Sequence, residues 1–133
     1  MAANDVARKE FLRDELGAYL TELGKRDPRV VVVNADLSKT SRNTEFVRQY
    51  PDRAFNVGIA EQNMVSFAAG LAHEGWMPFA YTMAPFMSMR ACEQCVELML
   101  PMRIFRYVLL VRMQAFPVEY LERLIGAWKI VQL

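Results

Sequence analysis

Cysteine and histidine are scarce in this chain of 133 residues, which contains two cysteines and one histidine. Two cysteines are too few for the disulfide framework of a small secreted protein. With His73 as the only histidine, a closed four-ligand zinc site and a Ser-His-Asp triad both lack a convincing set of residues. The N-terminal segment is charged where a secretory signal needs an apolar core. These absences predict a cytoplasmic protein.

An excess of charge of either sign is also missing, because 16 basic and 15 acidic residues leave a formal net charge of +1. We therefore expect no nucleic-acid partner and no membrane partner. The glycine motifs GxGxxG and GxxxxGKS/T are absent, which removes the usual phosphate-binding loops. The composition that remains, 53% hydrophobic and 23% charged, is typical of one soluble globular domain.

The hydrophobic pattern alternates between helical and strand-like periods. Apolar residues recur at three- and four-residue steps over Val6–Leu23, which predicts an amphipathic helix. The β-branched run Arg29–Asn34 is typical of a buried parallel strand, and a polar loop follows over Ala35–Asn43. The next helices and strands are expected, in alternation, at Thr44–Tyr50, Ala54–Val57, Ala60–Ala72, Trp76–Tyr81 and Met87–Cys95. This order predicts an α/β fold: a doubly wound, mainly parallel sheet with helices on both faces.

One acidic residue, Glu61, lies just after a predicted strand and a glycine, in the first turn of a predicted helix. Its carboxylate can act there as a functional acid or base. Alternatively, it only favours the helix N-terminus through capping and the helix dipole, an effect of up to about 1 kcal/mol. The spacing alone leaves both interpretations open.

The two cysteines, Cys92 and Cys95, have the CxxC spacing of a redox pair or of half a zinc site. They fall within a predicted helix and no second pair exists, so two ordinary semi-buried cysteines are the simpler interpretation. His73, near the end of another predicted helix, is interpreted as a partner of the helix dipole. We expect no metal site within this chain.

Four segments are similar to the pyrimidine-binding domain of the transketolase family, especially its split form, in which the second half of the enzyme is a separate chain. They read VVVNADLS, YPDRAFNVGIAEQNMVSFAAGLA, PFAYTMAPF and MRACEQ, and together they span most of residues 10–95. The resemblance implies a thiamine diphosphate-binding fold of the pyrimidine type. 1-Deoxyxylulose-5-phosphate synthase and the β subunits of 2-oxo acid dehydrogenases share this domain, but ADLS and AEQNMV are closest to transketolase.

The resemblance implies a catalytic role for Glu61 and a binding role for two residues of the third segment. Glu61 matches the family glutamate that hydrogen-bonds N1′ of the aminopyrimidine, a contact that favours the tautomer whose N4′ removes the C2 proton of the thiazolium. Phe86 matches the aromatic residue that stacks on the pyrimidine. Met83 stands where many relatives carry another aromatic residue.

The resemblance also assigns binding roles to four residues near the strand ends. Asp36 and Leu37 match the loop that approaches the cofactor from below the thiazolium, and the walls beside the glutamate are Ile59 and Gln62. The diphosphate and Mg²⁺ bind the other domain type of the family, which carries a GDG-type motif that this chain lacks. The resemblance therefore implies that thiamine diphosphate is shared with a diphosphate-binding partner chain, which also holds the Mg²⁺.

The family pattern ends abruptly after Cys95. We interpret residues 1–95 as a partial pyrimidine-binding domain, incomplete at its C-terminus, and residues 96–133 as an aberrant tail produced by a frameshift. Reading each residue from the third base of its codon and the first two bases of the next turns Met113-Gln114 into alanine and Trp128-Lys129 into glutamate. Both fall where the family continuation has these residues. An apolar run such as Tyr107–Val111 can still pair as a strand.

The DNA across the Cys95 codon tests this hypothesis. We expect a family-like continuation in the shifted frame, whereas an unambiguous single frame with no such alternative would contradict the frameshift.

Two functions from different classes follow from the sequence. In the first, the chain is a truncated transketolase subunit that contributes the pyrimidine half of the cofactor site for ketol transfer between sugar phosphates, in a dimer or heterotetramer. In the second, it is a non-catalytic fragment or assembly module. A fragment related to 1-deoxyxylulose-5-phosphate synthase or to a 2-oxo acid dehydrogenase β subunit is a further alternative.

Overall fold

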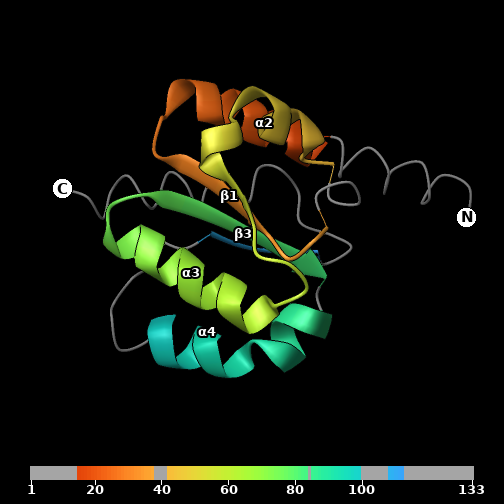
Figure 1. The fold of residues 1–133 in the computed structure, drawn as a ribbon, viewed down its shortest axis with the longest axis vertical. Helices are drawn as coiled ribbons and strands as arrows, with labels where there is room; N and C mark the ends of the chain where they lie inside the picture. The colour runs from red at the N-terminus through yellow and green to blue at the C-terminus, as the bar shows by residue number, and fades with distance from the viewer. Residues whose placement is uncertain (1–14, 38–41, 84, 100–107, 113–133) are drawn as a thin grey trace, which may run out of the picture.

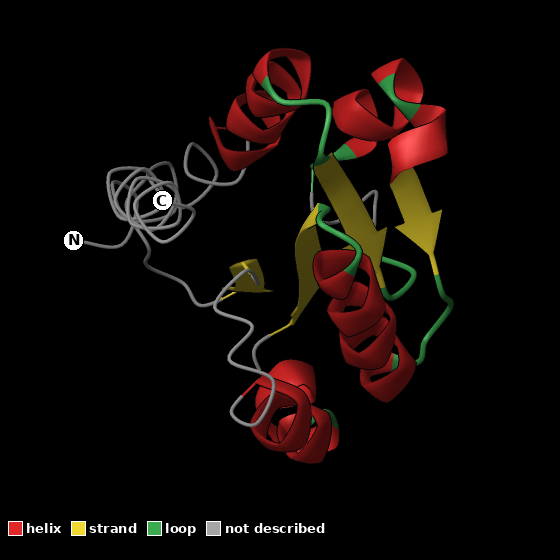
Figure 2. Cartoon of the chain, turned by 90° about the vertical axis from the view of Figure 1, so that its left-hand side faces the viewer, coloured by secondary structure: helices red, strands yellow, loops and turns green. Residues whose placement is uncertain are grey.

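A four-stranded parallel sheet forms the centre of the computed structural model, which describes residues 15–37, 42–83, 85–99 and 108–112. The strands are β1 (Val30–Asn34), β2 (Ala54–Asn56), β3 (Met77–Met83) and β4 (Val108–Arg112). They lie in the order β2-β1-β3-β4, and each neighbouring pair is parallel. Helices cover both faces of the sheet (Figures 1 and 2). The predicted doubly wound α/β fold is confirmed.

One face of the sheet packs against the first helix, described over residues 15–26, and against α2 (Thr44–Gln49). Side chains alternate between the two faces of a strand, so every second residue of β1 and β3 points to these helices. The buried cluster on this face consists of Leu20, Val30, Val32, Phe46, Met77, Phe79 and Tyr81. This cluster fixes both helices on the sheet.

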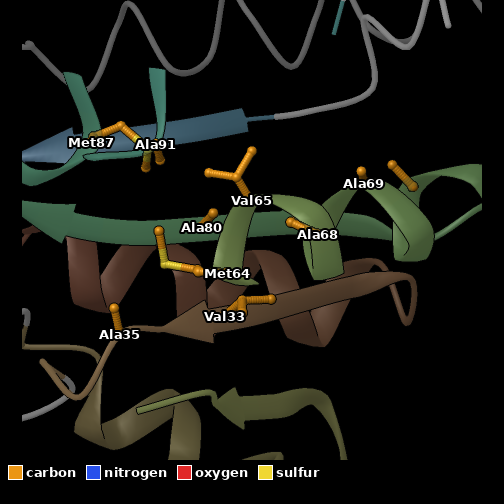
Figure 3. Close-up of a cluster of buried hydrophobic side chains, with 10 residues drawn as sticks. Val33, Ala35, Met64, Val65, Ala68, Ala69, Ala80, Met87 and Ala91 are labelled. Carbon is orange, nitrogen blue, oxygen red and sulfur yellow. The ribbon is translucent and has the colours of Figure 1, made fainter. Parts of the chain in front are cut away.

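The opposite face packs against α3 (Glu61–His73), with α4 (Cys92–Met99) beyond it (Figure 1). Val33 and Ala80 lie at paired positions of β1 and β3 and belong to the buried cluster on this face. Small residues of α3, among them Ala68 and Ala72, let the helix approach the sheet closely, and Figure 3 shows the side chains that gather there. This packing sets the position of the first turn of α3.

The structure corrects the predicted helix at Met87–Cys95. A π-helical turn, η2 (Phe86–Arg90), comes first, and α4 begins only at Cys92. Ala91 separates them with φ −109° and ψ 14°, outside helical geometry. The first helix continues through Gly24 to Arg26, three residues past its predicted end at Leu23. The remaining elements agree with the predictions to within two residues, with a short 3₁₀ turn, η1 (Pro51–Arg53), between α2 and β2. Residues 6–14 of the first predicted helix lie outside the described residues.

The predicted aberrant tail, residues 96–133, lies largely outside the described residues. β4 is the described strand within it, and it pairs in parallel with β3 from Phe79↔Val108 to Met83↔Arg112. In the part of the chain that the structure describes, no helix has the length and apolar character that a bilayer span requires.

Two glycines in helices are expected to respond oppositely to replacement by alanine. A Cβ on Gly17 would overlap the backbone carbonyl oxygen of Arg42, whereas a Cβ on Gly70 of α3 would meet nothing within 4 Å. Overpacking costs about 1–3 kcal/mol, which exceeds the gain of up to about 1 kcal/mol in helix propensity. We expect Gly17→Ala to lower the free energy of unfolding and Gly70→Ala to raise it by about 0.5–1 kcal/mol. Urea unfolding measures both, and a shift of both midpoints in one direction would contradict this packing.

Candidate functional site

The carboxyl ends of the parallel strands meet at one edge of the sheet, and the predicted site residues follow these ends. Asp36 lies two residues after β1, Glu61 begins the helix after β2, and Met83 is the last residue of β3. Ligands of open α/β sheets bind at this edge. The fold therefore collects residues from three separate segments at the place where a ligand site is expected.

A hydrogen-bond network joins the loops that follow β1 and β2. The backbone N–H of Asp36 donates to Oδ1 of Asn56 at 3.0 Å, and Nδ2 of Asn56 donates to Oδ1 of Asp36 at 3.1 Å. The backbone N–H of Gly58 donates to the same Oδ1 of Asn56 at 3.1 Å. Asp36 and Gly58 have φ of 56° and 75°, a left-handed conformation that glycine adopts at the lowest cost. Asn56 thus fixes the chain that leads into Glu61.

A second tether holds the ends of the polar loop that follows β1. Asn34, the last residue of β1, accepts a hydrogen bond from Nδ2 of Asn43 at 2.7 Å, and both side chains are buried. Asn43 directly precedes α2. This hydrogen bond closes the base of the loop, so the two ends of the predicted cofactor loop are held in fixed positions.

Glu61 is the buried carboxylate of this edge, with 4% of its side chain exposed. It is the first residue of α3, where the helix dipole favours negative charge. Nη1 of Arg90 lies 3.3 Å from both carboxylate oxygens and donates to them. A buried charge without a partner is costly, so this pairing is what makes burial of the carboxylate tolerable.

Arg90 also contacts the aromatic residue of the predicted site. Its Cζ lies 4.0 Å from the centroid of the Phe86 ring, one turn earlier in η2. Carboxylate, guanidinium and ring are thereby brought together, although Glu61 and Phe86 are 25 positions apart. The sequence analysis missed Arg90. Its spacing of four residues from Phe86 is a signal that could have found it.

The remaining predicted residues lie near the ends of β1, β2 and β3 along the chain. Ile59 and Gln62, which flank Glu61 along the chain, are exposed, whereas Leu37 and Met83 are partly buried. Asp36 is exposed and is held by Asn56. The roles of these five residues as binding or wall residues stay predictions.

Both cysteines belong to α4. In the described segments, no group of three or more His, Cys, Asp or Glu side chains is placed to hold a metal ion. Cys92 is exposed at the start of α4, and Cys95 is partly buried. Burial, and secondarily the charge of Cys92, raises the pKa of the Cys95 thiol.

Alkylation should distinguish the two thiols. Because the thiolate is the reactive form, we expect iodoacetamide at pH 8 to modify Cys92 several times faster than Cys95. Peptide mass spectrometry of samples quenched over time gives both rates. Equal rates would show that the partial burial of Cys95 does not protect it.

Comparison with known proteins identifies the family. Residues 11–116 match the family described as transketolase, pyrimidine binding domain. The chain belongs to this family. The match extends beyond Cys95 and includes β4. It agrees with the parallel sheet and its covering helices.

Transketolases and related synthases are among the similar proteins. The chain is 45% identical over 82 residues to a Methanocaldococcus jannaschii protein whose name provisionally describes a transketolase C-terminal section, covering 62% of this chain and 26% of that protein. It is 42% identical over 86 residues to the 6-deoxy-6-sulfo-D-fructose transketolase subunit SqwH of Clostridium sp. strain MSTE9, covering 65% and 27%. A 1-deoxy-D-xylulose-5-phosphate synthase of Aquifex aeolicus is 42% identical over 81 residues, covering 61% and 13%.

A solved structure is similar to this member of the transketolase family in both sequence and fold. It is described as a split gene transketolase, inactive beta4 tetramer. The two share 46% sequence identity and a TM-score of 0.59, over 64% of this chain and 28% of the other. The chain therefore spans about a quarter of the length of the transketolase relatives that it matches.

Proposed function

We propose that this chain supplies the pyrimidine half of a thiamine diphosphate site in a split transketolase. The observation that carries the proposal is the buried carboxylate of Glu61, which starts α3 at the carboxyl edge of the sheet and is joined through Arg90 to the ring of Phe86. The names of two relatives, a subunit and a C-terminal section, support an enzyme divided between chains. A partner subunit would then hold the diphosphate and its Mg²⁺, and the assembled enzyme would act in the cytoplasm.

The chemistry of these residues fits an aminopyrimidine. An ionised carboxylate is an acceptor for a ring N–H, and a phenyl ring offers a face for stacking. Both features already bind one planar group with N–H donors, the guanidinium of Arg90. The residues present therefore suit the pyrimidine part of the cofactor, and no described cluster suits its metal ion.

Glu61 would hold and move a proton at N1′ of the aminopyrimidine. When bound, thiamine diphosphate supplies the chemistry that breaks the carbon–carbon bond next to a ketone. The burial of Glu61 excludes water from its carboxylate, which strengthens the hydrogen bond to the ring nitrogen. Phe86 would orient the ring so that this nitrogen faces the carboxylate.

A second candidate has support from the similarity to 1-deoxy-D-xylulose-5-phosphate synthases, of which several are 36–42% identical to this chain. In that function the donor would be a 2-oxo acid in place of a ketose phosphate. The substrates offered in one assay separate the two functions.

The test mixes the purified chain with the diphosphate-binding subunit of a split transketolase, thiamine diphosphate and Mg²⁺. We expect a complex that transfers a ketol unit between sugar phosphates. Activity with pyruvate and glyceraldehyde 3-phosphate would favour the synthase, and activity with other 2-oxo acids would favour a dehydrogenase relative. Assembly without turnover would favour an assembly module.

A further inference from the structure

We propose that Arg90 competes with the aminopyrimidine for Glu61 and Phe86, so that the cofactor binds by displacing the guanidinium from both. This inference depends on the proposed function, since it concerns access to the same site. It goes beyond that function by assigning Arg90 a role: its side chain opposes cofactor binding and must move before the ring can bind.

The contacts of Arg90 are of the two kinds that a bound aminopyrimidine would make. Its Nη1 donates to both oxygens of Glu61 at 3.3 Å, and its Cζ lies 4.0 Å from the centroid of the Phe86 ring. A guanidinium is planar, delocalised and rich in N–H donors. An aminopyrimidine protonated at N1′ is also planar and carries N–H donors on its edge. Glu61 at 4% exposure leaves little room for both donors on the same oxygens.

The burial of the two partners shows which of them can move. Glu61 is fixed in the first turn of α3, whereas half of the Arg90 side chain is exposed. Arg90 is also the last residue of the π-helical turn, directly before Ala91 leaves helical geometry. The guanidinium can therefore swing into water, where a charged group is well solvated. Glu61 exchanges one N–H donor for another and never remains buried without a partner.

The strength of the Arg90 contacts sets the size of the expected effect. A half-exposed ion pair and a cation–π contact are each weak, so together they would reduce the affinity for the ring by about three- to tenfold. This change is large enough to measure and small enough for the cofactor to overcome.

The experiment titrates the ¹⁵N-labelled chain with thiamine, which carries the aminopyrimidine but needs no diphosphate-binding partner. NMR follows the backbone amides of residues 58–64 and the Nε–H signal of Arg90. We expect the Arg90 signal to shift toward that of a solvated arginine as the site saturates. The dissociation constant should fall by about three- to tenfold in Arg90→Ala. A stationary Arg90 signal in the bound chain would overturn the proposal.

Two further variants control the comparison. Arg90→Lys keeps a charge but loses the planar stack, so its affinity should lie between the other two, and it decides the question if Arg90→Ala does not fold. Arg48→Ala breaks an exposed ion pair with Glu45 on α2, on the opposite face of the sheet from α3, and should bind like the wild type. If the Arg90 variants bind thiamine as well as the wild type or less well, Arg90 positions Glu61 and does not compete.

Failure of this inference can be distinguished from failure of the proposed function. If the wild type binds thiamine and Glu61→Ala abolishes binding, the site stands, and unchanged affinity in the Arg90 variants removes the competition alone. If neither the wild type nor the Arg90 variants bind thiamine, the proposed site fails and the competition fails with it.

Discussion

Replacing Glu61 by glutamine is expected to slow proton exchange at C2 of thiamine diphosphate about 10²- to 10⁴-fold in the complex with a diphosphate-binding subunit. Glutamine keeps the shape and the hydrogen-bonding oxygen of glutamate but cannot exchange a proton with N1′. The rate is measured by acid quench of samples in D₂O, followed by ¹H NMR of the remaining C2 proton. Cofactor binding should change far less than the exchange rate.

The matched control is Glu45→Gln on α2. Glu45 is also paired with an arginine, and hydrogen bonds from Arg48 and then Gln49 lower its pKa to about 2, so it is ionised under the assay conditions. Glu45 is exposed and belongs to the opposite layer of helices. The C2 proton should therefore exchange in the Glu45→Gln complex at the wild-type rate. If Glu61→Gln exchanged the C2 proton as fast as this control, Glu61 would have no part in proton transfer.

The largest loss of stability is expected for Phe79→Ala, at about 3–5 kcal/mol. Phe79 is fully buried in β3, opposite Val32 of β1, and belongs to the cluster that holds the first helix and α2. Removing the ring leaves a cavity that strands paired on both sides cannot collapse to fill. The free energy of unfolding from urea titration gives the value, and a whole domain is usually stable by about 5–15 kcal/mol.

Phe67→Ala provides the comparison for the same chemical change. Phe67 lies on α3 with 37% exposure and packs edge-on against Phe55, with 5.2 Å between the ring centroids. Its removal should cost about 1 kcal/mol, the size of an exposed aromatic pair. Equal losses of unfolding free energy in Phe79→Ala and Phe67→Ala would mean that the buried cluster around β3 contributes no more to stability than an exposed aromatic pair.

The strands were predictable because their residues are selected for burial on both faces. The run at residues 30–34 has no polar side chain before Asn34, and this pattern fits a central parallel strand and little else. The break at Ala91 was not predictable, because residues 87–95 carry no proline or glycine to interrupt a helix. A π-helical turn places Arg90 against Glu61, and such a contact depends on packing between distant segments rather than on local propensity.

The candidate site was predictable only in part, because some of its contacts join segments that are distant in the sequence. The family resemblance selected Glu61 and Phe86, and the fold brings them to one edge of the sheet. The hydrogen-bond partners of Arg90 and Asn56 are 29 and 20 positions away, a spacing that no helical or strand period reveals. The four-residue spacing of Arg90 from Phe86 indicates only its contact with the ring. Side chains that join distant segments become visible only when the sheet has placed the strand ends together.

The central claim is that Glu61 of this chain completes a thiamine diphosphate site formed with a second subunit. Ketol transfer between sugar phosphates in the mixed assembly tests it most directly, with the wild-type chain and Glu61→Ala measured side by side. We predict that turnover needs both chains and that Glu61→Ala abolishes it while the complex still forms. Equal turnover with Glu61→Ala, or no turnover from a wild-type complex that binds the cofactor, would contradict the claim.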